Sequence, residues 1–223
     1  MFTILNTLAK VGGLTFSGMN LVYDLETTGA IENQGPFEHK PVIQRSQIYF
    51  RNNKYYAIIY PEIIEIAIKD YETGLIIMNK LVKANSTLTL GIQNITGITP
   101  NMLVGQSTLD QIKVELEDKL KLFTACNMLA HNGNSFDNKI MLFYKLLNPQ
   151  QVFFIDTLSV IPVHMESNSK LDKKNLSAIY YQLFKEKFQA HRAMNDVDAL
   201  IKIIHCTNHQ THPTCLLYTS PSP

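Results

Sequence analysis

The chain has 223 residues, of which 45% are hydrophobic, so it can bury one core of ordinary size and is expected to form one domain rather than two. This composition excludes a disulfide-stapled miniprotein and a disordered tail. Lys and Arg number 20 against 19 Asp and Glu, and the net charge of +1 excludes a protein held on nucleic acid or anionic lipid by its overall charge. Any such binding must be local.

The three cysteines form no C-x-x-C pair and lie at no zinc spacing, so neither a disulfide framework nor a structural zinc is expected. No run approaches the roughly 18 apolar residues of a membrane span, and the N-terminus lacks the basic stretch of a secretory signal. We therefore expect a soluble intracellular protein, cytoplasmic or nuclear, that does not associate with membranes.

Both ends of the chain are set apart from the expected domain, which covers residues 18–210. Residues 1–17 form an N-terminal extension with no assigned role. The last nine residues, 215–223, read CLLYTSPSP and resemble the conceptual translation of a transposase adaptor used in preparing sequencing libraries. We expect this tail to be non-native; the alternative is a natural disordered tail.

Residues 18–25, centred on LVYDL, have the composition of a β-strand and lead into a Thr-Thr-Gly turn. Because side chains alternate along a strand, Asp24 and Glu26 share one face, and Tyr23 and Leu25 share the other. The two acidic side chains are therefore expected to point the same way.

Residues 30–61 begin as a polar stretch with Gly and Pro and end in two β-rich runs separated by Asn52 and Asn53, which predicts an inserted β-hairpin. This insertion is either a solvent-facing decoration or an element that gates substrate or binds a partner. A second hairpin is predicted over residues 61–70 and 75–83. Its first strand is apolar on both faces and is therefore expected to be buried.

Further along the chain, apolar residues repeat at helical spacing in four stretches, and two short apolar runs have the length of strands. The helical stretches are 109–123, 140–147, 176–183 and 197–204, and the strands are 127–131 and 152–156. This order predicts an α/β domain whose mixed sheet has an antiparallel hairpin at one side and parallel strands at the other, flanked by helices.

The motif DLETTG at residues 24–29 carries the strongest chemical signal. Two carboxylates that point the same way from one strand repel each other unless a cation lies between them, and a divalent metal is the natural occupant. The alternative for a bare Asp-x-Glu is a strand that simply ends in a polar turn. The motif alone does not decide between them.

Two further carboxylates favour the metal site. Asp137 follows the predicted strand at 127–131 and opens a helix, where an anion is tolerated in the first turn. Asp196 borders the apolar side of the last helix, and a carboxylate directed at a core costs several kcal/mol unless it is paired or bound to metal. Each also has a plain structural alternative, because Asp occurs at helix starts without further function.

Taken in order, DLETTG (24–29), AHNGNSFD (130–137) and HRAMND (191–196) resemble the three motifs of the DEDDh, or DnaQ-like, 3′-to-5′ exonucleases. That family includes polymerase proofreading subunits and TREX-type repair enzymes. The resemblance covers about residues 20–205 and implies an RNase H-like fold.

The resemblance also implies the catalytic residues. The family's four acidic positions and its histidine match Asp24, Glu26, Asp137, Asp196 and His191. Oxygen ligands with incomplete protein coordination suit two Mg²⁺ ions, with Mn²⁺ as a substitute, and Asp24 would bridge them. His191, expected on a mobile loop before the last helix, would accept a proton from the attacking water.

Substrate contacts are expected around the same motifs, with the backbone of residues 25–28 holding the terminal nucleotide. The expected contact residues are Leu25, Thr27, Thr28, Asn132 and Phe136. Phe136 is equally well explained as a core aromatic at a helix start. A cluster of lysines is either a phosphate track or a solvated face: Lys170, Lys173 and Lys174.

The function that follows is a metal-dependent 3′-to-5′ exonuclease that removes nucleoside monophosphates from single-stranded 3′ ends. DNA is favoured over RNA, in proofreading or repair, and a polymerase partner is left open. One alternative is an RNA-trimming exonuclease, because the sequence identifies no reader of the 2′-hydroxyl. The other is a catalytically silent nucleic-acid-binding or scaffold module, which the presence of all four carboxylates and His191 disfavours.

Overall fold

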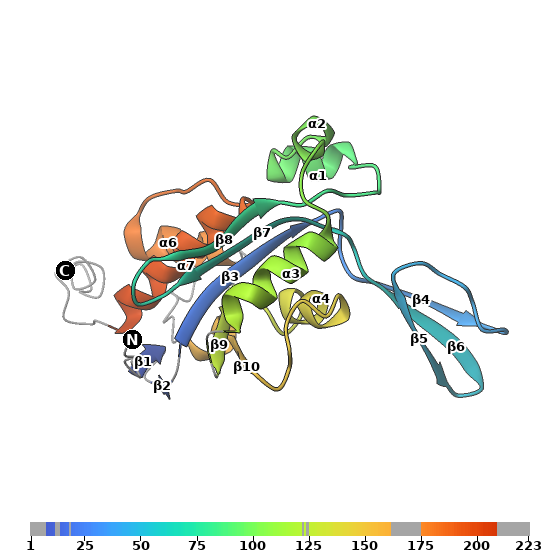
Figure 1. Ribbon diagram of the computed structural model, residues 1–223, viewed down its shortest axis with the longest axis horizontal. Helices are drawn as coiled ribbons and strands as arrows, with labels where there is room; N and C mark the ends of the chain where they lie inside the picture. Colours follow the sequence, from blue (N-terminus) through green and yellow to red (C-terminus); the bar gives the residue numbers. More distant parts are fainter. Residues whose placement is uncertain are drawn as a thin grey trace, which may run out of the picture.

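The computed structural model describes residues 8–11, 14–17, 19–121, 123, 125–161 and 175–208. Its centre is a five-stranded mixed sheet with the strand order β10-β9-β3-β7-β8 (Figure 1). The strands are β3 Met19–Thr27, β7 Ile63–Asp70, β8 Ile76–Leu81, β9 Cys126–Ala130 and β10 Val152–Asp156. β7 pairs antiparallel with β3 and β8, whereas β9 pairs parallel with β3 and β10. The predicted mixed sheet is confirmed.

β3 lies in the middle of this sheet and separates two hydrophobic cores. Tyr23 and Leu25 belong to the core on one face, and Val22 belongs to the core on the other. The alternation expected from the sequence is therefore present. β7 is buried along almost its whole length, as its apolar composition predicts, because helices cover both faces of the sheet.

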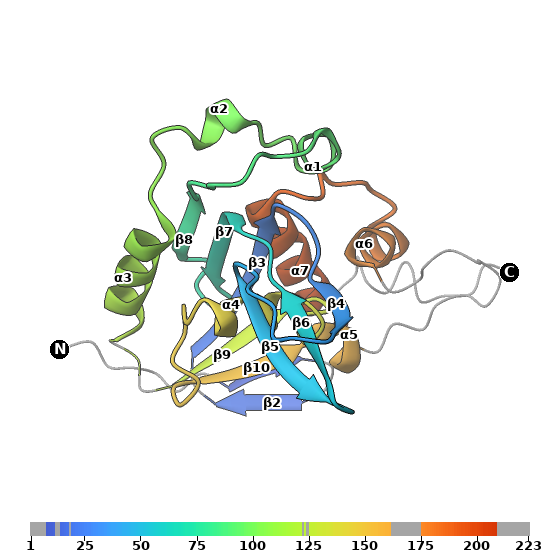
Figure 2. The ribbon, with the colours of Figure 1, turned by 90° about the vertical axis from the view of Figure 1, so that its right-hand side faces the viewer.

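Figure 2 shows α3 and α4 on one side of strands β3, β7 and β8, with α6 and α7 on the other. The helices are α3 Leu109–Leu120, α4 Asp137–Phe143, α6 Leu176–Phe184 and α7 Ala193–Asn208. Ile112 and Leu116 of α3 are buried in the first core, and Val197 and Leu200 of α7 in the second. α4 ends earlier than the predicted 140–147 stretch because Lys145 has a left-handed φ of 54°, which no helix continues.

The insertion contains the predicted β-hairpin, which a third strand that was not predicted extends into a three-stranded antiparallel sheet. Its order is β4-β6-β5, with β4 Glu32–Phe37, β5 Ser46–Arg51 and β6 Lys54–Ile59. β5 and β6 form the expected hairpin around Asn52 and Asn53. β4, with the sequence ENQGPF, has neither the β-branched residues nor the alternation of a strand and is ordered by pairing with β6. We call this sheet the arm, because it projects from the domain (Figure 1).

Three short helices and one hairpin were not expected from the sequence. The helices are α1 Leu90–Thr96, α2 Pro100–Leu103 and α5 Thr157–Val160, and the hairpin joins β1 Leu8–Val11 to β2 Leu14–Ser17. Helices this short carry too little periodicity to be recognised. The cluster Lys170, Lys173 and Lys174 and the tail 215–223 lie outside the described residues. None of the helices described here is both long and apolar enough to cross a membrane.

Candidate metal centre

The acidic centre begins on β3, where alternation directs Asp24 and Glu26 to the same side of the sheet. Asp196 reaches the same place from α7, which packs on β3 and β7. Each of the three offers a carboxylate oxygen, and these oxygens lie within 4.8 Å of one another. Residues 172 positions apart in the sequence thus share one site, which suits a single cation held by oxygen ligands.

Asp137 borders this group of three from the opposite core. It is the first residue of α4, which confirms its predicted place in a first helical turn, and it is only 4% exposed. Its Oδ1 accepts a hydrogen bond from the backbone N–H of Leu25 at 3.2 Å, so it is tied to the middle of the Asp-x-Glu motif. Among the described residues the group within 4.8 Å contains the other three carboxylates and not Asp137.

Burial and mutual repulsion perturb the whole centre. Desolvation, followed by the charges of neighbouring carboxylates, holds the pKa of Asp24 well above its usual range and raises the pKa of Glu26 to about 8. Desolvation is also the main cause that raises the pKa of Asp137 to about 7 and that of Asp196 to about 6. The centre therefore holds more buried negative charge than the protein alone compensates, which is the electrostatic signature expected of a cation site.

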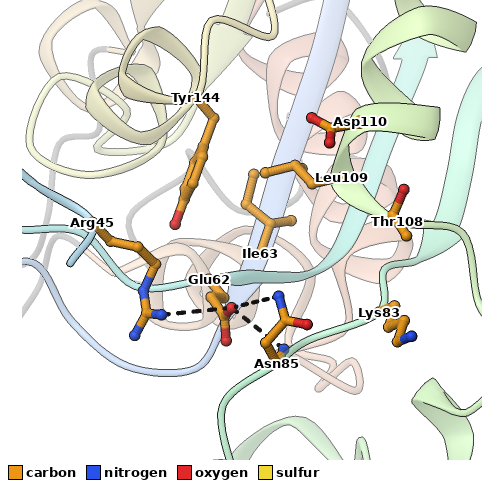
Figure 3. Close-up of a pocket in the computed structure, with 9 residues that line it drawn as sticks. All are labelled: Arg45, Glu62, Ile63, Lys83, Asn85, Thr108, Leu109, Asp110 and Tyr144. Carbon is orange, nitrogen blue, oxygen red and sulfur yellow. Dashed lines mark hydrogen bonds and ion pairs between the residues drawn. The ribbon is translucent and has the colours of Figure 1, made fainter.

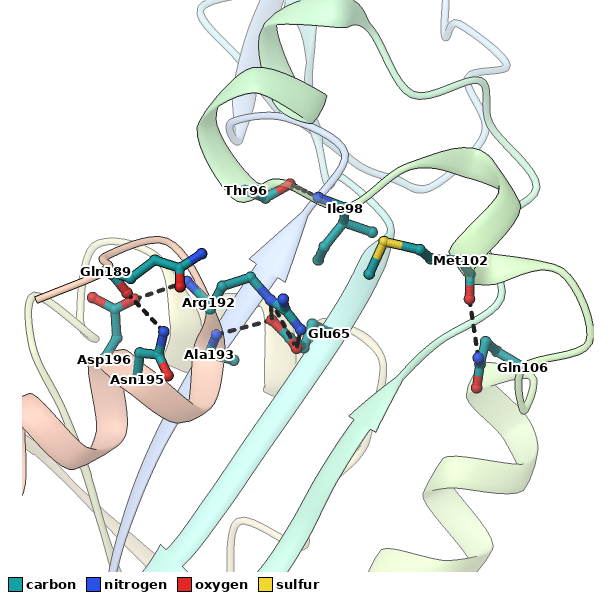
Figure 4. A network of polar contacts seen from close by, with 10 residues as sticks. All are labelled: Glu65, Thr96, Ile98, Met102, Gln106, Gln189, Arg192, Ala193, Asn195 and Asp196. Atoms are coloured by element: carbon teal, nitrogen blue, oxygen red, sulfur yellow. Dashed lines mark hydrogen bonds and ion pairs between the residues drawn. The ribbon is translucent and has the colours of Figure 1, made fainter.

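An ion pair between a buried carboxylate and a half-buried arginine, next to the centre, was missed by the sequence reasoning. Glu65 of β7 lies directly opposite Glu26 of β3 and is only 3% exposed. Arg192 donates to its carboxylate through Nη2 at 2.7 Å and through Nε at 3.1 Å (Figure 4). The N–H of Ala193 donates to the same carboxylate at 2.9 Å. The available signal was a carboxylate in the middle of a strand that is apolar on both faces, because such a group needs a partner.

The Arg192–Glu65 pair fixes the segment that carries His191. His191 is exposed, has a left-handed φ of 63°, and directly precedes the residue that binds Glu65. It lies just before α7, as predicted, and it partly offsets the desolvation that raises the pKa of Asp196. The carboxylate of Asp196 in turn accepts the backbone N–H of Arg192 at 3.2 Å. The backbone that carries His191 is therefore fixed beside the acidic centre, and its side chain is exposed.

The residues expected to hold substrate in and after the Asp-x-Glu motif are unequally accessible. Leu25 is 4% exposed and packs in the core, so any contact it makes with substrate must come from its backbone. Thr27 is 6% exposed, and its hydroxyl donates to the carbonyl of Gly29 at 2.7 Å. Thr28 is half-buried, and its hydroxyl accepts the N–H of Glu62 at 3.0 Å.

The other two expected contacts lie at the start of α4. Asn132 is exposed and has a left-handed φ of 61°, a conformation that asparagine tolerates better than most residues. Phe136 is half-buried and packs against the first core, immediately before Asp137. That these two residues line a common cleft with the acidic centre stays a prediction.

Solved structures with this fold include several nucleases of low sequence identity. The zinc-bound E. coli ExoI–ssDNA complex has a TM-score of 0.55 at 19% identity over 86% of this chain. Exonuclease X in complex with 5′ overhanging duplex DNA has a TM-score of 0.50 at 20% identity over 90%. Cell-death related nuclease 4 (CRN-4) has a TM-score of 0.54 at 18% identity over 83%.

The match in length differs among these proteins. The chain spans 41% of the ExoI chain, 62% of CRN-4 and 99% of Exonuclease X. At these identities the likeness establishes the RNase H-like fold, as predicted. A family model described as Exonuclease (RNase_T) matches residues 21–204, which include all four carboxylates and His191. The chain therefore belongs to the exonuclease family.

Proposed function

We propose that this chain is a metal-dependent nuclease that hydrolyses nucleic acids stepwise from the 3′ end, with single-stranded DNA as its substrate. The observation that carries the proposal is the convergence of Asp24, Glu26 and Asp196 within 4.8 Å, beside the buried Asp137. Membership in the exonuclease family supports a role for these carboxylates in the hydrolysis of nucleic acid. A role in DNA repair or proofreading is part of the proposal.

The centre suits hard divalent cations. Its donors are all carboxylate oxygens, and their raised pKa values reflect a charge that a cation would balance. Asp24, Glu26 and Asp196 would hold Mg²⁺ or Mn²⁺, with Asp137 acting beside them, and two ions are proposed. When bound, such ions lower the pKa of water and neutralise charge on the phosphate.

His191 supplies the base in this proposal, which assigns the chain to the DEDDh type. Its imidazole lies at the rim of the centre, where water and substrate can reach it. A neutral histidine has a pKa suited to accepting a proton near neutral pH. The left-handed turn and the Arg192–Glu65 ion pair hold its backbone without covering the ring.

The choice of single-stranded DNA is supported by what the structural relatives bind. ExoI is described in a complex with single-stranded DNA and Exonuclease X with 5′ overhanging duplex DNA. No residue of this chain is identified as a reader of the 2′-hydroxyl, so RNA serves as the competing substrate in the test.

The test uses DNA and RNA oligonucleotides of the same sequence, labelled at either end, with the full chain in Mg²⁺ or in EDTA. A 5′-labelled strand should shorten one nucleotide at a time, and a 3′ label should be released at once as a mononucleotide. Asp24→Asn should abolish the reaction and His191→Ala should slow it by about 100-fold or more. Asp118→Asn, an exposed carboxylate on α3, is the matched control and should behave like the unmodified protein.

Three results would contradict the proposal. Cleavage at internal positions would indicate an endonuclease, and undiminished hydrolysis in EDTA would exclude the metal. Equal rates for Asp24→Asn and Asp118→Asn would remove the acidic centre from the reaction.

A further inference from the structure

The arm has no part in the proposed reaction, yet it begins and ends at the acidic centre. Thr28 follows β3 and Glu62 precedes β7, and the N–H of Thr28 donates to the carbonyl of Glu62 at 2.9 Å. This contact closes the arm at its base, two residues after Glu26 on one side and three before Glu65 on the other. The base of the arm therefore lies close along the chain to two carboxylates at or beside the centre.

The base of the arm is fixed to the domain. Tyr60 stacks on Phe143 of α4 with ring centroids 4.0 Å apart, and its N–H donates to the carbonyl of Arg45. The guanidinium of Arg45 lies 3.7 Å from the carboxylate of Glu62, beside a pocket of about 420 Å³ (Figure 3). Tyr144 closes the other side by donating to the carbonyl of Pro61 at 2.9 Å. The arm is thus an anchored extension of the domain.

One face of the arm combines aromatic rings with cations. Directly opposite residues of neighbouring strands share a face, and the register pairs Tyr49 with Tyr56 and Arg51 with Lys54. We call these four residues, with Gln47 and Ile58, the tyrosine face. The two tyrosine rings are stacked at 5.3 Å and 16°, and Tyr49 is 41% exposed. An open hollow of about 660 Å³ lies against Gln47, Ile48, Tyr49 and Ile58.

The charge of the arm favours a polyanion on this face. Residues 30–61 contain four Lys and Arg but two Asp and Glu, and one of the four cations, Arg45, pairs with Glu62 at the base of the arm. Lys54 pairs with Glu38, but Arg51 makes no ion pair with the described part of the chain. On the opposite face the register places Glu32 beside Ile59, and that face of the three strands has no cation.

We propose that the tyrosine face binds the single-stranded nucleic acid whose 3′ end occupies the acidic centre. Bases would stack on Tyr49 and Tyr56, and phosphates would meet Arg51 and Lys54, as in other single-strand binding surfaces that combine aromatic rings with positive charge. This inference rests on the proposed function, which supplies the strand. In this proposal the arm binds substrate and takes no part in the chemical step.

The opposite face of the arm provides a matched control. Phe50 and Tyr55 form a second aromatic pair on the same two strands, with ring centroids 4.8 Å apart and Phe50 58% exposed. Tyr49→Ala with Tyr56→Ala can therefore be compared with Phe50→Ala with Tyr55→Ala. Both double variants remove one cross-strand aromatic pair, and thermal unfolding followed by circular dichroism verifies that each is folded.

The experiment measures binding and hydrolysis with strands of two lengths. In EDTA, fluorescence anisotropy with a DNA of about 20 nucleotides should show Kd raised by about fivefold or more for the tyrosine variant and unchanged for the control. In Mg²⁺, the ratio of kcat/KM for this strand to that for a trinucleotide should fall in the tyrosine variant alone. Arg51→Gln should reduce the salt dependence of log K by about 0.7, the value for one phosphate of a single strand. RNA of the same sequence tests whether the face distinguishes the two sugars.

The inference is overturned if a folded tyrosine variant binds and cleaves the long strand like the control variant. A protein partner would then be the remaining candidate for binding the tyrosine face. It is also overturned if both double variants weaken binding equally. Hydrolysis of the trinucleotide by the unmodified protein, and its loss in Asp24→Asn, reports on the proposed function separately. A failure of the proposed nuclease activity can therefore be distinguished from a failure of the proposed strand binding by the tyrosine face.

Discussion

Replacing Glu26 with glutamine is expected to make the metal-free protein more stable at alkaline pH while weakening its response to magnesium. Burial and neighbouring carboxylates raise the pKa of Glu26 from 4.5 to about 8 in the folded protein. The folded state therefore binds this proton more tightly than the unfolded state. Its stabilising effect is complete below about pH 4.5 and is lost as the pH rises to about 8.

The size of the effect follows from these two values. One pH unit corresponds to 1.36 kcal/mol, so the upper limit for the stability lost between pH 4.5 and 8 is about 5 kcal/mol. Water penetration and relaxation around a charge reduce such values, and about 2 kcal/mol is expected. Glutamine keeps the shape of the side chain but carries no charge, so the variant should gain about this amount near pH 8.

Urea unfolding in EDTA at several pH values between about 5 and 8 measures the prediction directly. The free energy of unfolding of the unmodified protein should fall with pH, and the slope should be shallower in Glu26→Gln by up to about 1.4 kcal/mol per pH unit. Magnesium at about 100 times its Kd should restore about 2.7 kcal/mol to the unmodified protein and less to the variant. Glu117→Gln, an exposed position on α3, controls for the substitution itself.

Equal slopes for Glu26→Gln and the unmodified protein would refute the reasoning. So would a variant that is less stable than the unmodified protein in EDTA near pH 8. Either result would mean that the carboxylates of the centre are already balanced by the protein.

Three further substitutions separate positioning, packing and helix formation. Arg192→Lys keeps the positive charge but cannot make the two-pronged contact of the guanidinium with Glu65. Because the backbone that carries His191 is then less well fixed, kcat should fall several-fold with little change in KM. Steady-state kinetics that show a rise in KM alone would contradict this. Leu116→Ala removes a fully buried side chain of α3 and should lower the free energy of unfolding by about 2 to 5 kcal/mol in urea, while kcat of the folded protein stays unchanged. Thr108→Ala removes the capping box of α3 and should cost about 1 kcal/mol by the same assay, and no measurable cost would mean that water replaces the cap.

The parts of the fold that the sequence predicted are those determined by local pattern. β3 has the apolar, β-branched and aromatic composition of a strand, and the two long helices α3 and α7 carry apolar residues at helical spacing, so each element could be recognised alone. The same signals placed Asp137 in a first turn and Asp196 beside an apolar stripe. Their convergence with Asp24 was expected from a family resemblance, since no local pattern specifies a contact between β3 and α7.

The parts that were missed depend on partners far away in the sequence. β4 is a strand only because β6 lies beside it, and its own residues favour a loop. Glu65 and Arg192 are 127 residues apart, so the apolar strand around Glu65 indicates that this carboxylate needs a partner but not which residue supplies it. Leu25 is a different case, because the alternation that put Asp24 on one face already placed Leu25 on the other, toward the core.

Two hydrogen bonds between Thr28 and Glu62 hold together the two ends of the insertion that forms the arm. Because the two ends of the insertion already lie together, a change in its length alters only the entropy of loop closure. This cost is about 0.6 kcal/mol for each doubling of a flexible loop. We expect that shortening, lengthening or exchanging it leaves the register between β3 and β7 unchanged. Changes in the insertion can therefore alter the binding surface of this protein while the positions of its metal-site carboxylates stay the same.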